Sequence, residues 1–545
     1  MLAKGHMYPA VLLLLLKGAT EPRCAEAEIS AGLRFLVVFP ENIAYYYPED
    51  PQNQVHVTAL YDNTEVTVAF QDQIRTETLD AAQTRRFLFS RTAELRRENV
   101  ADKVVRVNST RRVTVHAISL KAGSVQSARV VPVDALGTEY LVPPIPEIQG
   151  TTRPADVVNS NVTERAPFRL ILVNAEKVNK VSLEGEDGLT GEEELEPHHA
   201  AQFWLDADNA WRVVRAQHPV AALFGHPCAA TRNCSCSMLY VTLSPKPRDK
   251  MAFLVPPMPY QNAEELISVL LSEELHENSS LVDSSYPGWP VLELPGPAIL
   301  HRPGLLLPLI PQSELASCFV VNAIPDMRNF AIILVRKDLT GGVRVGGGPP
   351  EDPVWLPLTG SDFVSTLVNL TVDNNAIWHT SNKMAVYYVG QNGDVLFGNP
   401  APAVSQTSDY RGCVLLPDVL EFGSEALGWQ ESVKFCRDRN FHLVSLSSLP
   451  LRNHVQAKIR QEYTGDDAPR RAWIGLRRST LTGAWYWLNK VAVTVSNWVE
   501  TESTPRGRCG AINLEPGEDF GWSREDCCQD IHPICYRGPH CFPVQ

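Results

Sequence analysis

The chain has 545 residues, of which 44 % are hydrophobic and 20 % are charged, and its formal net charge is −13. This length predicts several folded domains rather than one. The acidic balance argues against a nucleic-acid-binding protein, because phosphate groups need basic surfaces.

Residues 1–27 have the pattern of a secretory signal peptide. Lys4 and His6 precede an apolar run from Pro9 to Leu16, and Ala25-Glu26-Ala27 offers a small-x-small cleavage site. No later stretch approaches the roughly 18 apolar residues of a membrane helix. We therefore predict a secreted, extracellular protein without a membrane span.

Cysteines and sequons agree with this prediction. Twelve cysteines suit an oxidising compartment. Asn-x-Ser/Thr sequons are acceptors for N-linked glycans in secreted proteins. We predict glycosylation at Asn108, Asn161, Asn233, Asn278 and Asn369.

From residue 32 to 402 the sequence predicts short β-strands. Runs of apolar or β-branched residues lie at Leu33–Phe39, Val55–Tyr61, Glu65–Phe70, Val104–Val107 and Val113–Ile118. Asp62-Asn63-Thr64, between the second and third runs, predicts a hairpin turn. Short strands separated by Pro, Asn and Gly indicate antiparallel β-sandwiches.

A weak internal repeat subdivides this region. One motif occurs at Tyr140–Pro146, Phe253–Pro259 and, more loosely, Leu305–Pro311. Another occurs at Arg112–Ala117, Pro219–Phe224 and, as a further candidate, Lys383–Tyr388. We predict tandem antiparallel β-sandwich-like modules over residues 28–140 and 141–250, with further module(s) over 251–402. Within the last, Ile267–Leu271 is predicted as a strand despite the helical composition around it.

The segment Val130–Tyr140 resembles the signature of the N-terminal region of IgGFc-binding proteins, which are secreted and mucus-associated. Gly225-His226-x-Cys228, followed by Cys234 and Cys236, fits the same region. The resemblance covers roughly residues 32–400 and implies an extracellular binding or scaffold role. It does not carry antibody binding, because no residue here is matched to an antibody contact.

His226 and the cysteines after it could form a zinc site on residue types alone. The oxidising compartment favours disulfides, and the two-residue spacing usual between zinc-binding cysteines is absent. We predict that Cys228 and Cys234 are disulfide-bonded and that no metal or cofactor is bound. His198-His199 is predicted to be solvent-exposed.

Residues 403–412 are polar and predict a linker into a last domain at 413–537, with a tail at 538–545. Helices are expected over Leu427–Asn440 and after Ser447-Ser448, followed by strands at Ala472–Leu476 and Trp485–Trp487. Cysteines and tryptophans recur from Trp429 to Cys535, and Trp473, Trp485 and Trp487 are predicted to be core residues. The whole pattern resembles an α+β C-type lectin-like domain.

This resemblance implies the disulfides Cys436–Cys535 and Cys509–Cys527. Cys413, Cys528 and Cys541 are additional, and a Cys528–Cys541 pair stays open. Loss of Cys24 with the leader would leave an odd number of cysteines. That number permits a disulfide between chains, although a buried free cysteine explains it equally well.

The residues that bind calcium in sugar-binding members of this family are largely replaced. Those members place Glu-Pro-Asn or Gln-Pro-Asp after the tryptophan matched by Trp498, and Trp-Asn-Asp before the penultimate cysteine. Here the two triplets are Glu502-Ser503-Thr504 and Trp522-Ser523-Arg524. Arginine supplies no acceptor, so we predict that the usual calcium-dependent sugar site is absent.

The loop surface around these triplets is the candidate ligand surface. It comprises Glu502, Thr504, Arg506, Arg508, Arg524 and Glu525. Two interpretations remain open for it: a solvated loop of mixed charge, or a calcium-free contact with a protein or glycan.

The chain contains no Gly-x-Ser-x-Gly, His-Glu-x-x-His or P-loop pattern, so we predict no enzyme. The predicted function is extracellular recognition of a protein or glycan without calcium, in a setting such as mucosal or innate defence. One alternative is a structural mucus or matrix component without a specific ligand, with disulfide-linked or non-covalent self-association. Another is a calcium-dependent carbohydrate-binding lectin.

Overall fold

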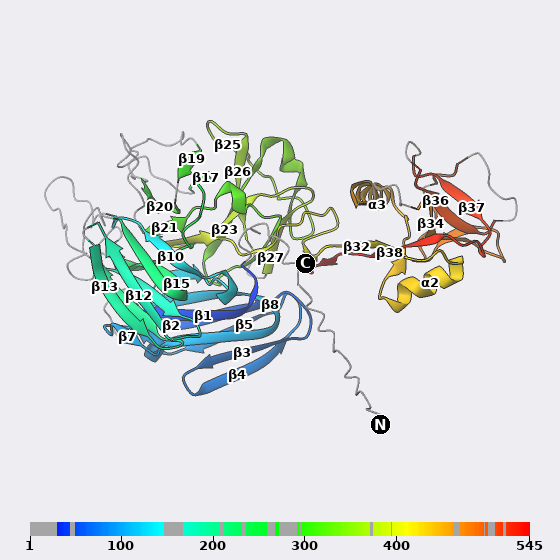
Figure 1. Cartoon of the computed structure of the whole chain (residues 1–545). Coiled ribbons are helices and arrows are strands. Elements are labelled where there is room, and N and C mark those ends of the chain that lie inside the picture. Colours follow the sequence, from blue (N-terminus) through cyan, green and yellow to red (C-terminus); the bar gives the residue numbers. More distant parts are fainter. Residues whose placement is uncertain are drawn as a thin grey trace, which may run out of the picture. The chain divides into compact units, whose positions relative to one another are not determined.

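The computed structural model contains two compact units (Figure 1). The β-rich unit comprises Met1–Gly341, Pro350–Asn375 and Lys383–Gln406, and the C-terminal unit comprises Gly342–Pro349, Ala376–Asn382 and Thr407–Gln545. The structure describes residues 30–43, 50–121, 123–146, 167–186, 188–205, 211–230, 236–258, 268–271, 291–294, 296–302, 304–370, 374–393, 395–462, 469–494, 496–499, 507–515 and 519–544. In this described part no helix is long and apolar enough to cross a membrane.

The first strand set of the β-rich unit is built around one long strand. Its members are β1 (Gly32–Pro40), β2 (Gln52–Ala59), β3 (Thr64–Phe70), β4 (Gln73–Leu79), β5 (Thr84–Phe89), β6 (Glu94–Leu95), β8 (Val104–Lys121) and β9 (Ser124–Arg129). The short strand β7 (Val100–Ala101) pairs instead with Ala200–Ala201 of the second set. The first half of β8 pairs with β1 and β3, and its second half pairs with β2 and β9. The two runs predicted as separate strands at 104–107 and 113–118 are therefore one strand that serves two groups of neighbours.

The second strand set repeats this arrangement. It comprises β10 (Gly137–Val142), β11 (Phe168–Asn174), β12 (Asn179–Gly185), β13 (Gly188–Leu195), β14 (Ala200–Leu205), β15 (Arg212–Ala230) and β16 (Cys236–Thr242). The long strand β15 pairs with β10 and β12 and, further along, with β11 and β16. The hairpin β12–β13 thus corresponds to β3–β4, and the pair β11–β14 corresponds to β2–β5.

The remaining strands of this unit follow the same scheme in part. They are β17 (Met251–Phe253), β18 (Ser268–Leu271), β19 (Leu292–Leu294), β20 (Ala298–Arg302), β21 (Leu305–Pro308), β22 (Cys318–Asn322), β23 (Arg328–Arg336), β25 (Leu356–Pro357), β26 (Phe363–Asn369), β28 (Ala385–Asn392), β29 (Val395–Pro400) and β30 (Ala403–Ser405). β23 pairs with β26 and β28, and β28 pairs with β29. The three copies of the second repeated motif fall on three different strands. Residues 383–388 run into β28, residues 112–117 lie in β8, and residues 219–224 lie in β15.

The predicted hairpin at Asp62-Asn63-Thr64 is wrong. β2 pairs with β5 and β8, whereas β3 pairs with β4 and β8, so the turn joins strands that are not neighbours. The hairpin is instead β3–β4, in which Phe70 opposes Gln73. Both runs have strand propensity, but their partners lie elsewhere in the chain.

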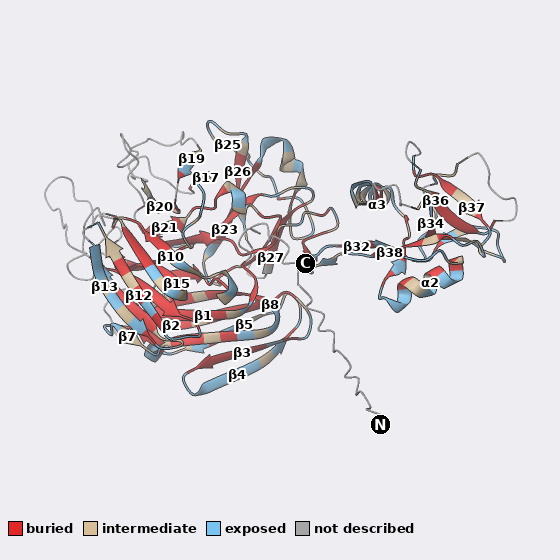
Figure 2. Ribbon diagram, viewed as in Figure 1, coloured by how far each residue is buried: buried red, intermediate tan, exposed pale blue. Residues whose placement is uncertain are grey.

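The strand sets share cores rather than standing apart. Leu36 and Val104 of the first set pack with Ile171, Leu223 and Tyr240 of the second in one buried cluster. Polar contacts follow the same boundary: Gln126 Nε2 donates to the Tyr240 carbonyl at 2.7 Å. Figure 2 shows the buried faces of these strands in red. The predicted division between residues 140 and 141 falls inside β10.

The C-terminal unit combines two helices with a mixed sheet. It contains β24 (Val343–Val345), most of β27 (Asn374–His379), β31 (Val414–Leu416), β32 (Val419–Phe422), α2 (Trp429–Asp438), β33 (His442–Leu443), α3 (Leu449–Glu462), β34 (Arg471–Arg478), β35 (Trp485–Trp487), β36 (Cys509–Asn513), β37 (Trp522–Glu525), β38 (His532–Arg537) and β39 (His540–Cys541). Its main sheet has the order β32-β38-β34-β36-β37. Short 3-10 helices elsewhere in the chain occupy Arg91–Ala93, Val133–Ala135, Gln312–Glu314 and Lys337–Gly342.

Tryptophans fill both sides of this sheet. Trp429 and Trp473 pack in one buried cluster, and Trp487 and Trp522 pack in the other. Trp473 Nε1 donates to the Leu427 carbonyl at 2.7 Å, so its burial leaves the indole N–H satisfied. Disulfides join Cys436 to Cys535 and Cys509 to Cys527, the pairs that the resemblance implied.

The predicted linker and tail belong to the folded units. Residues 403–405 form β30 in the β-rich unit, and the Ser30 amide donates to the Ala403 carbonyl at 2.8 Å. Residues 407–412 belong to the C-terminal unit. β39 of the predicted tail pairs with β31. Strand pairing therefore orders residues 403–405 and the predicted tail despite their polar composition.

Candidate binding surface of the C-terminal unit

The candidate surface lies at one end of the sheet formed by β34, β36 and β37. β36 pairs with both neighbours, and the Cys509–Cys527 disulfide ties the start of β36 to the turn after β37. This covalent tie fixes the end of the sheet from which Arg508 and Arg524 project.

An aromatic cluster supports this end of the sheet. The ring centroid of Trp498 lies 4.6 Å from that of Trp485 and 5.8 Å from that of Trp522. Trp487 lies 5.2 Å from Trp522 in an edge-to-face arrangement. Trp473 and Trp487 are core residues as predicted, but Trp485 is only half-buried. Trp485 and Trp498 therefore present part of their rings to solvent.

One arginine contacts the partly exposed ring of Trp498, and two exposed arginines lie at the same end of the sheet. The Arg524 guanidinium carbon lies 5.1 Å from the ring centroid of Trp498, within cation–π distance. Arg508 is exposed, and its amide donates to the Glu525 carbonyl at 3.1 Å. The Arg478 amide donates to the Arg508 carbonyl at 2.8 Å, which places a second exposed arginine next to Arg508 in the backbone pairing. We call Trp498, Arg478, Arg508 and Arg524 the arginine–tryptophan surface.

The other predicted surface residues are placed differently. Glu525 is buried, and its carboxylate accepts a hydrogen bond from Arg471 Nη1 at 3.0 Å. The prediction of Glu525 as an exposed ligand residue is therefore wrong, because β37 turns its side chain toward β34. Glu502, Thr504 and Arg506 lie outside the described residues.

The described residues at this end of the sheet do not fit a calcium ion. Calcium takes six to eight oxygen ligands. Position 524 carries a guanidinium that lies over the Trp498 ring, and the carboxylate of Glu525 is paired with Arg471. A cation and an already paired carboxylate are a poor donor set for a second cation.

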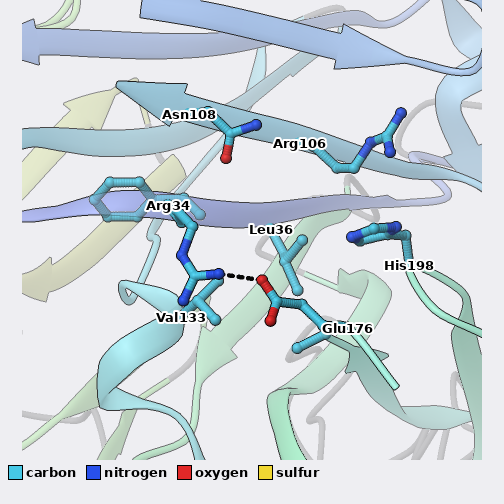
Figure 3. Close-up of a pocket in the computed structure, with 9 residues that line it drawn as sticks. Arg34, Leu36, Arg106, Asn108, Val133, Glu176 and His198 are labelled. Atoms are coloured by element: carbon cyan, nitrogen blue, oxygen red, sulfur yellow. Dashed lines mark hydrogen bonds and ion pairs between the residues drawn. The ribbon is translucent and has the colours of Figure 1, made fainter. Parts of the chain in front are cut away.

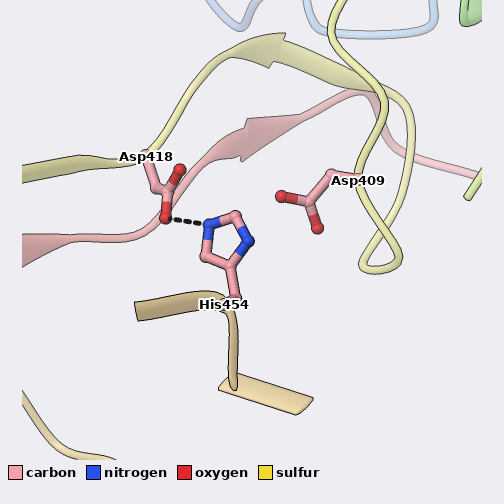
Figure 4. Close-up of side chains that lie close together, drawn as sticks. All are labelled: Asp409, Asp418 and His454. Carbon is pink, nitrogen blue, oxygen red and sulfur yellow. Dashed lines mark hydrogen bonds and ion pairs between the residues drawn. The ribbon is translucent and has the colours of Figure 1, made fainter. Parts of the chain in front are cut away.

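A second polar cluster lies at the start of the C-terminal unit (Figure 4). The buried Asp418 carboxylate accepts hydrogen bonds from His454 Nε2 at 2.8 Å and Tyr536 Oη at 2.9 Å, and Lys458 Nζ lies 2.8 Å from its other oxygen. Arg411 binds Asp409 through two nitrogens, at 2.8 and 2.6 Å. We call these six residues the Asp418 cluster. It fastens residues 409–418 to α3 and β38.

The charges of the Asp418 cluster are already balanced. Asp409, Asp418 and His454 are close enough to hold a metal ion. Arg411 and Lys458, however, supply two positive charges to the two carboxylates. Burial alone would raise the pKa of Asp418, but hydrogen bonds from His454 and Lys458 outweigh it and lower that pKa. The cluster is therefore a structural ion network.

Sequence reasoning missed the Asp418 cluster. Asp409 and Arg411 fall in the segment predicted as linker, and His454 is separated from Asp418 by 36 positions. The charged residues between 409 and 418 were the only sequence signal for this cluster. The signal is weak, because no local pattern shows that these residues contact α3.

The predicted sequons and cysteines are only partly described. Asn108 and Asn369 are exposed on β8 and β26, whereas Asn161, Asn233 and Asn278 lie outside the described residues. Cys228 is disulfide-bonded, which removes it as a zinc ligand, and Cys234 lies outside the described residues. Cys528 and Cys541 are free, so they do not pair with each other.

The histidine pair at 198–199 is half-buried rather than exposed as predicted. The His198 amide donates to the Ala175 carbonyl at 3.1 Å, which holds its turn against the end of β11. The acidic composition around the pair did not reveal this contact.

The sheet order, the helices and the two disulfides define a C-type lectin fold. Residues 425–537 match the family described as "Lectin C-type domain". The chain is 30 % identical over 124 residues to ovocleidin-17 of Gallus gallus and covers 86 % of that protein. Through its C-terminal unit, the chain belongs to the C-type lectin domain family.

Two further comparisons cover different shares of this chain. The chain is 24 % identical over 408 residues to the human (Homo sapiens) IgGFc-binding protein, a match that covers 65 % of this chain and 7 % of that protein. The crystal structure of ovocleidin-17, a protein of the Gallus gallus eggshell calcified layer, matches with 28 % identity and a TM-score of 0.19. That match covers 22 % of this chain and 90 % of the other.

Proposed function

We propose that this chain is a secreted, non-enzymatic glycoprotein that recognises an acidic extracellular glycan or protein without calcium. The C-terminal unit supplies the contact, and the β-rich unit acts as a scaffold of tandem β-sandwich modules. Family membership supports recognition as the role of the C-terminal unit. The likeness to IgGFc-binding protein supports an extracellular setting, such as mucosal defence.

The arginine–tryptophan surface carries this proposal. Guanidinium groups bind carboxylates and sulfates through paired hydrogen bonds, and they remain charged at any physiological pH. Partly exposed indole rings such as Trp498 offer a flat apolar face for a sugar ring or an aromatic side chain. Arg524 lies over this ring, and Arg478 and Arg508 are exposed at the same end of the sheet, so an acidic ligand would meet positive charge and an aromatic face together.

Binding screens on the full-length protein test the proposal. Glycan and acidic-peptide arrays are read with calcium and with chelator, using wild type, Arg508→Ala and Arg524→Ala. Arg470→Ala is the matched control, because its side chain is 85 % exposed. We expect sulfated, sialylated or acidic-peptide hits that are indifferent to calcium. Each surface variant should bind about tenfold more weakly, since a hydrogen bond to a charged group contributes about 1.5–3 kcal/mol. Binding that needs calcium, or that survives both surface variants, would refute the proposal.

One observation favours a structural role as a second candidate. Cys528 is a free, exposed thiol in the C-terminal unit. In an oxidising compartment such a thiol can join two chains. A disulfide-linked dimer on a non-reducing gel that disappears in Cys528→Ser, together with blank arrays, would favour a matrix component over a recognition protein.

A further inference from the structure

A polar pocket in the β-rich unit surrounds one of the sequons (Figure 3). Arg34 opposes Asn108, and Leu36 opposes Arg106, across the antiparallel pair β1–β8. Glu176 and His198 reach the same space from the turns after β11 and before β14. The cavity measures about 170 Å³. This is below the roughly 300–1,000 Å³ of pockets for drug-sized ligands, so it suits a group of the size of one sugar ring.

The pocket offers hydrogen-bond donors that its own walls do not use. Arg34 is neutralised by ion pairs with Glu176 and Asp134. Among the described residues, the side chains of Arg106, Asn108 and His198 have no hydrogen bond or ion pair. Burial, and next the Arg106 charge, lower the pKa of His198. A neutral imidazole offers one donor and one acceptor.

The walls of the pocket are rigid. The buried Asn174 side chain donates to the carbonyls of Lys177, Leu195 and Glu196 at 2.7, 3.0 and 2.9 Å. These bonds fix both turns that carry Glu176 and His198. His198 itself has a φ of 61°, a left-handed conformation that is uncommon for a residue other than glycine. A pocket with fixed walls loses little conformational entropy when it is filled.

A free monosaccharide would bind weakly to so small and open a site, but a tethered one would not. Asn108-Ser109-Thr110 is a sequon, and Asn108 is an exposed residue at the rim of the pocket. Attachment at this residue makes binding intramolecular, with an effective concentration in the millimolar range.

We propose that the N-linked glycan on Asn108 folds back into this pocket, where its first N-acetylglucosamine is held by Arg106 and His198. In the attachment step, Asn108 Nδ2 forms a bond to the anomeric carbon of a lipid-linked oligosaccharide diphosphate. The bond from that carbon to the diphosphate breaks, and the amide loses a proton as the diphosphate leaves. The acetamido and hydroxyl oxygens of the sugar then accept hydrogen bonds from Arg106. The inference rests on the secretion proposed above.

Site-resolved glycan release from the full-length secreted protein tests the inference. Asn369 is the internal reference, because it is exposed on β26 and outside the pocket. Occupancy at both sequons is measured by mass spectrometry, and a peptide-N-glycosidase then acts on the folded protein. We expect release at Asn108 to be about tenfold slower than at Asn369, which corresponds to about 1.4 kcal/mol of pocket binding.

Variants of the pocket residues distinguish two causes of slow glycan release at Asn108. One is binding of the sugar in the pocket, and the other is steric hindrance of the glycosidase by the strand. Arg106→Ala combined with His198→Ala should bring release at Asn108 within about threefold of that at Asn369. Arg111→Ala is the matched control, because Arg111 is an exposed arginine of β8 outside the pocket; it should leave the protection intact. An unchanged rate at Asn369 shows that each variant is folded.

Three results would overturn the inference. They are an empty Asn108 beside an occupied Asn369, equal release rates at the two sites, and protection that survives the double variant. Each of these leaves the proposed secretion standing. A secreted fraction without a glycan on either sequon, or no secretion at all, would refute the proposed function as well.

Discussion

At the scale of single residues, Asp418 shows how the C-terminal unit holds its first segment. Its side chain is 4 % exposed and lies within hydrogen-bond or ion-pair distance of His454, Lys458, Tyr536 and Arg411. A buried charge is tolerated only when it is paired and hydrogen-bonded. Removing one partner from such a network costs more than the network contributes as a whole, because the remaining charges stay buried.

Asp418→Asn should destabilise the C-terminal unit by about 3–5 kcal/mol, because Arg411 and Lys458 lose their shared carboxylate. Chemical denaturation of the full chain, followed by near-ultraviolet circular dichroism, measures this loss. Glu421→Gln is the control, since Glu421 is an exposed carboxylate on the neighbouring β32. Equal stabilities for the two variants would show that the network is dispensable.

Two buried histidines make the β-rich unit sensitive to acid. His56 and His116 oppose each other across β2 and β8. Burial and the Arg129 charge lower the pKa of His116 to about 4, and burial and the Arg86 charge lower that of His56 to about 3. In the unfolded chain both histidines become protonated below a pH of about 6.5, the ordinary pKa of histidine. Above that pH these histidines do not reduce the free energy of unfolding. As the pH drops from about 6.5 toward 4, each histidine lowers that free energy by up to about 1.4 kcal/mol per pH unit.

His116→Gln should flatten this dependence. We expect the unfolding free energy of the β-rich unit to fall less steeply between pH 6.5 and 4 in the variant than in the wild type. Denaturant titrations at several pH values test this, with His442→Gln as the control, because His442 is exposed in the other unit. Parallel pH profiles for wild type and His116→Gln would contradict the assignment.

At the scale of elements, the long strands β8 and β15 organise the β-rich unit. Each pairs with one group of strands along its first half and with another along its second half. The exposed polar stretch Asn108–Arg112 marks the change of neighbours in β8. In β15, the second half approaches β16 so closely that a Cβ at Gly225 would lie 1.9 Å from the Leu239 carbonyl oxygen.

Gly225→Ala should therefore destabilise the β-rich unit by at least about 3 kcal/mol, because backbone atoms of β16 would have to move. Thermal unfolding monitored by hydrogen exchange in β15 and β16 gives the measurement. Gly341→Ala is the control, since a Cβ there has no heavy atom within 4 Å; it should change stability by less than about 0.5 kcal/mol. A Gly225→Ala variant as stable as this control would rule out the close strand contact.

At the scale of the whole molecule, two units with different constructions share one chain. Shared cores stabilise the β-rich unit, whereas disulfides and tryptophans stabilise the C-terminal unit. In the C-terminal unit, Arg524 lies over Trp498, and the Glu525 carboxylate is paired with Arg471.

Calcium should leave the thermal unfolding of the full chain unchanged. A calcium site at 100 times its dissociation constant would add about 2.7 kcal/mol to stability. Differential scanning calorimetry with calcium, with chelator and with magnesium at equal ionic strength tests this. A transition raised by calcium alone and restored by chelator would show that residues outside the described part complete a site.

Local patterns predicted much of the fold. The spacing of Trp429, Val433 and Cys436 indicated α2, which runs from 429 to 438, and Pro450 after two serines indicated the start of α3. The absence of the usual calcium ligands at Ser523 and Arg524 stays a prediction from the family resemblance. The candidate surface was predicted only in part, because Glu525 is buried against Arg471.

The sequence by itself determined where strands and helices form, which cysteines and tryptophans make the lectin-like frame, and that an arginine occupies position 524. Periodicity and residue type are local, so they can be read without knowing neighbours. Only the tertiary structure decided that two predicted strands are one strand, β8, and that Asp418 meets His454 and Arg411. It also decided that Asn108 borders a pocket with Arg106 and His198. These features depend on contacts between residues far apart in the chain, and no local pattern specifies such partners.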